Sequence, residues 1–130
     1  MACAGVATLF ITQDYLLRFK KWDPCTGGTF DPNIENGLKF VEQHIDELMN
    51  AGNFYALYGI ERIATASGRR YFGAIDWFQS GVDSAIKRQN PAGRFNGIYG
   101  AVPDTSFALL FLSRGRAPVM MNKLQYTPWK

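Results

Sequence analysis

The chain has few of the residues from which disulfide, metal and histidine-based catalytic sites are built. Its 130 residues include only two cysteines, Cys3 and Cys25, and one histidine, His44. Two cysteines are too few for a disulfide framework, and neither has the close cysteine or histidine neighbours of a zinc site. We therefore expect buried free thiols, a surface histidine, no metal site and no cofactor.

Long apolar runs and dense clusters of one charge are also missing from the sequence. No uninterrupted apolar stretch reaches the ~20 residues that a membrane-spanning helix needs. The apolar start of the chain lacks the basic region of a signal peptide. The net charge is +3, but the 14 Lys and Arg are spread along the chain. Nucleic-acid binding requires basic residues on one face, so we expect neither nucleic-acid binding nor a membrane span. The nearest approach to a basic cluster is Arg69-Arg70 and a tail with Arg114, Arg116, Lys123 and Lys130.

Apolar and aromatic residues are abundant. Hydrophobic residues make up 47% of the chain and aromatic residues 15%, which excludes a disordered or collagen-like chain and indicates a large buried core. The length fits one domain spanning residues 1–130.

The spacing of the apolar residues predicts an all-α fold with five helices. The first, third and fifth helices are apolar on most sides, as buried helices are, whereas the second and fourth are amphipathic. Gly68 is a natural end for the third helix, and Asp104 is a natural N-cap for the fifth. The expected helices span Ala2 to Lys20, Pro32 to near Gly52, Phe54 to Ala66, Asp76 to Gln89 and Ser106 to Arg114.

The apolar helices contain an internal repeat. Three six-residue segments align, each with Ala in second place and a large apolar residue in sixth: 6–11, 55–60 and 107–112. Gly37-Leu38 and Gly81-Val82 correspond in the two amphipathic helices between them. Small residues let helices approach closely. The period is that of a two-helix repeat, so the chain comprises about two and a half helical hairpins. The alternative is that buried helices simply look alike.

The turn after the fourth expected helix carries the most specific motif. Gln89, Gly93 and Phe95 resemble the QW repeat of squalene-hopene cyclases, with Phe95 in place of the tryptophan. Residues 53–126 and 9–16 resemble the prenyltransferase and squalene-oxidase repeats of large proteins from planctomycete-type bacteria. In that family the glutamine caps a neighbouring helix end and the aromatic ring stacks on it. The resemblance implies the same bracing role for Gln89 and Phe95.

The resemblance also implies an architecture. These proteins form an α/α toroid of alternating inner and outer helices, and five helices are too few to close one. The chain starts inside an inner-type helix and stops just after Trp129, so we expect a fragment of a larger, incomplete toroid. An exposed repeat flank then favours a homo-oligomer, with a two-fold dimer as its simplest form.

No complete catalytic site is present in the sequence. Cyclases of the resembled family protonate an alkene with an Asp-x-Asp-Asp-Thr motif, but the corresponding positions 101–105 read Ala-Val-Pro-Asp-Thr. Pro103 stands where the central acid would be, so Asp104 is better explained as a helix cap. Glu61 and Asp104 are the only plausible carboxylate pair, and Glu61 beside Arg62 is equally consistent with an internal salt bridge.

Two functions remain open. The favoured one is a non-catalytic helical repeat module that supports protein or ligand binding inside a larger protein. The alternative is part of a terpenoid-cyclase-like enzyme whose catalytic acid lies in other repeats, with aromatic rings stabilising carbocations. Both place the candidate pocket on the inner helices, at Tyr55, Tyr58, Glu61, Asp104, Phe107 and Phe111, with Phe10 as a further inner aromatic residue.

Overall fold

The computed structural model describes residues 1–18 and 31–115, which are mostly helical. Six helices and one small hairpin occupy these residues. The elements, in chain order, are α1 (Ala2–Arg18), α2 (Pro32–Gln43), α3 (Ile45–Asn50), α4 (Phe54–Ser67), β1 (Tyr71–Phe72), β2 (Ile75–Asp76), α5 (Trp77–Ile86) and α6 (Ala101–Gly115). The predicted helical fold is confirmed, although a hairpin and a sixth helix were not expected.

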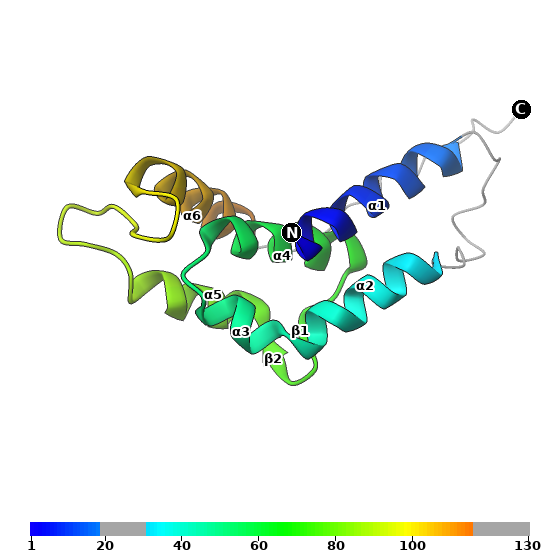
Figure 1. Cartoon of the computed structure of the whole chain (residues 1–130), viewed down its shortest axis with the longest axis horizontal. Helices are drawn as coiled ribbons and strands as arrows, with labels where there is room; N and C mark the ends of the chain where they lie inside the picture. The colour runs from blue at the N-terminus through cyan, green and yellow to red at the C-terminus, as the bar shows by residue number, and fades with distance from the viewer. Residues whose placement is uncertain (19–30, 116–130) are drawn as a thin grey trace, which may run out of the picture.

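The helices lie in two layers (Figure 1). Helices α1, α4 and α6 form one layer, with α4 in contact with both α1 and α6. Helices α2, α3 and α5 form the other layer, in which α3 contacts α5. The chain alternates between the layers, and the described helices do not close into a ring.

Helix α4 is the centre of the core. Asn53 caps its start by accepting a hydrogen bond from the Ala56 N–H at 3.0 Å. Gly68 ends it with φ of 67°, a left-handed conformation that glycine adopts at little cost. The structure therefore places this helix as predicted. Its buried side chains include Leu57, Ile60 and Ile63, which belong to the core cluster formed by residues of both layers.

The second predicted helix is divided at His44. Asp31 and Pro32 start α2 as expected, with Asp31 accepting from the Asn33 N–H at 2.8 Å. His44 then leaves the helical conformation, with φ −114° and ψ 13°, and its Nδ1 lies 2.8 Å from the Phe40 carbonyl oxygen. The His44 N–H still donates to the Phe40 and Val41 carbonyls, at 3.2 Å each. The prediction of one continuous helix was therefore wrong, and His44 is half-buried rather than fully on the surface.

A short hairpin precedes α5. Strands β1 and β2 pair antiparallel, with Tyr71 opposite Asp76. Gly73 in the turn has φ of 60°. Helix α5 begins at Trp77 and ends at Ile86, three residues before the predicted end, because the N–H groups of Arg88 and Gln89 bond in tighter turns to the carbonyls of Ala85 and Ile86.

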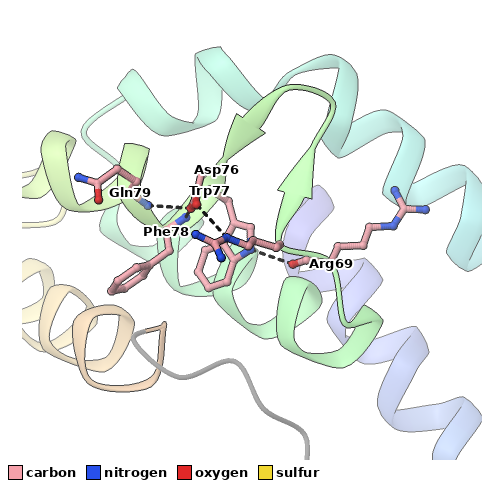
Figure 2. A network of polar contacts seen from close by, with 6 residues as sticks. Arg69, Asp76, Trp77, Phe78 and Gln79 are labelled. Atoms are coloured by element: carbon pink, nitrogen blue, oxygen red, sulfur yellow. Dashed lines mark hydrogen bonds and ion pairs between the residues drawn. The ribbon is translucent and has the colours of Figure 1, made fainter.

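Asp76 connects this hairpin to α5 (Figure 2). Its carboxylate accepts hydrogen bonds from the N–H groups of Phe78 and Gln79, at 3.2 and 3.1 Å, and pairs with the Arg70 guanidinium at 3.2 Å. The Trp77 indole N–H donates to the Arg69 carbonyl at 2.9 Å. The segment after α4 is thereby attached to both strands and to the next helix.

Two glycines let helices of the two layers approach closely, and side-chain hydrogen bonds connect α5 and the turn after it with α3. A Cβ atom on Gly37 would collide with Val6 of α1, and one on Gly81 would collide with Phe111 of α6. The two corresponding glycines thus serve close helix approach, as expected, although Gly37 contacts the preceding helix α1 and Gly81 the following helix α6. In the layer of α2, α3 and α5, the Ser84 hydroxyl donates to the Met49 carbonyl at 2.7 Å, and Arg88 donates to the Asn50 carbonyl at 2.7 Å.

Some predictions fall outside the described residues. These are the end of the first helix at Lys20, the loop with Cys25 and Gly27-Gly28, and the tail beyond Pro118.

Candidate functional site

Aromatic residues of the α1, α4 and α6 layer form a shallow hollow. Its volume is about 390 Å³, and it is lined by Tyr55, Tyr99, Pro103 and Phe107. Tyr55 comes from α4, Pro103 and Phe107 from α6, and Tyr99 from the loop before α6. The lining is almost entirely apolar, so the hollow suits an apolar group of side-chain to isoprenoid size.

The rings around the hollow hold one another in place. Tyr55 meets Phe107 edge to face with ring centres 5.2 Å apart, and it meets Tyr99 in the same way at 6.4 Å. Tyr58 lies against the other side of Phe107 at 5.8 Å. These geometries are favourable for aromatic pairs, so the hollow has ordered walls before any ligand arrives.

Asp104 positions the loop that carries Tyr99. Its Oδ2 accepts hydrogen bonds from the N–H groups of Gly97 and Tyr99, at 3.0 and 3.1 Å. The residue is fully buried, and Oδ1 has no hydrogen-bond partner among the described residues. Asp104 was predicted to be the N-cap of its helix, but α6 begins at Ala101, so Asp104 lies in the first turn and binds the preceding loop instead.

The other pocket candidates do not line the hollow. Phe111 is buried between the layers, against Trp77 and Phe78 at 6.0 and 5.7 Å. Glu61 is buried within α4, where it accepts a hydrogen bond from the Thr65 hydroxyl at 3.3 Å. Phe10 packs, partly buried, against the core. Tyr55, Tyr58 and Phe107 are therefore the candidates that the fold brings together.

The turn that contains Gln89, Gly93 and Phe95 contacts α4 and α6 through its aromatic residue. Phe95 is buried and meets Phe54, the first residue of α4, edge to face at 5.6 Å. Its N–H donates to the Thr105 hydroxyl of α6 at 3.1 Å. Gln89 pairs with Phe95 in an isolated β-bridge, and its side chain donates to the Gly93 carbonyl at 3.3 Å. The glutamine thus closes its own turn, and the contact with neighbouring helices comes from Phe95.

The other candidate groups are Arg69, Arg70 and Cys3. Arg69 pairs with Glu35 and Glu42, at 3.6 and 3.3 Å. Arg70 pairs with Asp76, so this basic dipeptide does not form a free cationic surface. Cys3 is buried and free, as expected, and burial raises the pKa of its thiol.

Two features are absent from the part of the chain that the structure describes. Among those residues, no group of three or more His, Cys, Asp or Glu side chains lies where it would hold a metal ion. Within residues 1–18 and 31–115, no helix combines the length and the apolar character required to cross a bilayer.

Two residues that line the hollow, Tyr99 and Pro103, were not predicted from the sequence. Tyr99 lies in a Gly- and Asn-rich loop, where aromatic residues carry no periodic signal. Pro103 was considered only as a replacement for an acid. The available signal was Asp104, a helix-start carboxylate able to bind loop N–H groups, which directly follows Pro103 and lies a few residues after Tyr99.

Comparison with known proteins gives no relatives. No protein-family model matches the chain, and neither a curated protein nor a solved structure matches it significantly.

Proposed function

We propose that the chain is a non-catalytic helical repeat module that binds an apolar segment of a protein partner, or a small apolar ligand, in the hollow between α4 and α6. The observation that carries this proposal is the aromatic lining of Tyr55, Tyr99, Pro103 and Phe107. Aromatic and proline side chains give large contact area and lose little conformational entropy on binding.

We further propose that the module belongs to a larger prenyltransferase and squalene-oxidase repeat protein and forms part of an incomplete α/α toroid. The alternation of the chain between two layers supports this assignment. The contacts of Phe95 with Phe54 and Thr105 brace α4 against α6, which is the role expected of the motif, although Gln89 closes its own turn instead of capping a neighbouring helix. We also propose that the chain forms a homo-oligomer through its exposed repeat flank, which carries large apolar side chains.

The binding function is tested by NMR with two probes, a short apolar peptide and a prenyl alcohol. We expect the amide signals of Gly97, Tyr99 and Gly100 to shift on titration and the shifts to be lost in Phe107→Ala. Tyr99→Ala should weaken binding, whereas Tyr71→Ala should not. Tyr99 is 53% exposed and Tyr71 is 50% exposed, so the two substitutions remove similar amounts of exposed tyrosine surface. If neither probe moves these signals, the proposed binding site is wrong.

A terpenoid-cyclase-like enzyme is the second candidate, because the same aromatic faces would stabilise a carbocation. Incubation with squalene or a prenyl diphosphate, followed by mass spectrometry, tests it. A cyclised product that disappears in Phe107→Ala would overturn the non-catalytic proposal.

A further inference from the structure

The two outermost helices of the α1, α4 and α6 layer expose apolar side chains. We call Ile11, Tyr15 and Leu16 the α1 edge, and Val102, Leu109 and Leu110 the α6 edge. All six side chains are at least 40% exposed. Contiguous exposed apolar side chains favour an interaction surface, whereas apolar residues exposed singly are ordinary.

The positions of α4 that correspond to the α6 edge are covered by other parts of the fold. Leu57 on α4 and Leu109 on α6 hold the same place in the sequence repeat. Leu57 is 1% exposed and Leu109 is 57% exposed. Tyr58, next to Leu57, packs on Phe107 of the following helix in the layer, whereas its counterpart Leu110 is 40% exposed. The α6 edge therefore repeats the α4 surface that receives α6, and no helix within residues 1–18 and 31–115 covers it.

Charge distinguishes the α6 edge from the solvent-facing surface of the other layer, whereas the exposed Asp14 lies beside the α1 edge. Helices α2 and α3 carry charged residues over their short lengths, including Glu35, Lys39 and Glu47. Helix α6 carries only Asp104, which is buried, and Arg114 at its end. The exposed neighbours of Leu109 are Ser106 and Ser113, so burying the α6 edge would desolvate no charge there.

We propose that the occupant is a second copy of this chain, docked head to tail with its α1 edge on the α6 edge of the first. This inference rests on the proposed homo-oligomer and specifies its geometry. An inner helix placed beside α6 continues the order in which α4 follows α1 and α6 follows α4. A head-to-tail contact leaves one edge of each kind free, so association proceeds beyond two copies, to a ring or a filament. A two-fold dimer would instead pair one edge with itself.

Two charge variants and their mixture test this geometry by sedimentation velocity. Leu109→Glu blocks the α6 edge, and Ile11→Lys blocks the α1 edge. We expect each variant alone to be monomeric where wild type associates, with a dissociation constant raised at least about tenfold, which corresponds to about 1.4 kcal/mol. An equimolar mixture should form a pair of two copies and stop there, because it retains one intact edge of each kind. Circular dichroism checks that each variant keeps its helices, and formation of the mixed pair itself shows that both are folded.

The other outcomes overturn the inference in distinguishable ways. A monomeric wild type at millimolar concentration would refute the homo-oligomer itself. Association that is sensitive to one variant only would indicate symmetric pairing of one edge, and the head-to-tail geometry would be wrong while the homo-oligomer stands. If neither variant reduces association, the contact lies elsewhere. The ligand-binding hollow is unaffected by any of these results.

Discussion

The hairpin and α5 both depend on the carboxylate of Asp76. Burial raises the pKa of Asp76, but hydrogen bonds from the Gln79 N–H, the Arg70 guanidinium and the Phe78 N–H more than offset this effect, and the net pKa is lowered. A lowered pKa means that the ionised carboxylate stabilises the folded state.

We predict that Asp76→Ala lowers the free energy of unfolding by about 1 kcal/mol at neutral pH, because it removes a helix N-cap. Asp76→Asn should cost less, since asparagine also caps helices but lacks the charge that pairs with Arg70. The charge-dependent part is present above roughly pH 4, the ordinary range of an unfolded aspartate, and is lost as the pH falls through the lowered pKa. Urea unfolding at pH 7 and pH 3 measures this.

A matched control lies on the same helix. Asp83 is exposed and accepts a hydrogen bond only from the Gln79 side chain among the contacts described. Asp83→Asn should change stability by less than about 0.5 kcal/mol at either pH. An Asp76→Asn variant that differs equally from wild type at both pH values would contradict the electrostatic explanation.

At the scale of helices and strands, glycine determines how closely the layers approach. Gly81 of α5 faces the Phe111 ring, whereas a Cβ atom on Gly5 of α1 would meet nothing within 4 Å. Both glycines lie within helices, so their intrinsic effects on helix formation are alike. The difference between them isolates the packing contribution.

We predict opposite effects for the two alanine substitutions. Gly81→Ala should destabilise the fold by about 1–3 kcal/mol from overpacking, less the helix propensity gained. Gly5→Ala should stabilise it by about 0.5–1 kcal/mol, because alanine restricts the unfolded chain and has space in the folded one. Thermal unfolding followed by circular dichroism checks both. Equal shifts in the same direction would show that the Gly81–Phe111 contact does not limit packing.

The sequence was sufficient for helices with strong periodicity and clear ends. Helix α4, between Asn53 and Gly68, was predicted within one residue. The hairpin was missed because each strand is only two residues long and offers no alternation to detect. The break at His44 is a single non-helical residue in an otherwise periodic segment, and the early start of α6 accompanies the loop contacts of Asp104. Neither feature leaves a periodic signal in the sequence.

At the scale of the molecule, the candidate site was predictable only in part. Tyr55, Tyr58 and Phe107 were expected on inner helices, and they do meet. Phe111 was expected with them but faces the other layer, because Gly81 leaves space for its ring. Helical periodicity gives the face of a side chain but not the rotation of one helix against the next, so the sequence alone could not separate Phe111 from the others.

If copies associate, thermal stability must depend on protein concentration, because association stabilises the folded state by mass action. We predict that the midpoint of thermal unfolding of wild type rises with concentration, whereas that of Leu109→Glu stays constant. Differential scanning calorimetry over a hundredfold concentration range measures both. A constant midpoint for wild type would argue against self-association.

The central position of α4 has a consequence for how the chain unfolds. Seven of its fourteen residues are buried, and it contacts α1 on one side and α6 on the other. Removing either neighbour uncovers the same helix, so neither half of the fold retains a complete core without the other. The chain should therefore melt in a single cooperative transition rather than repeat by repeat.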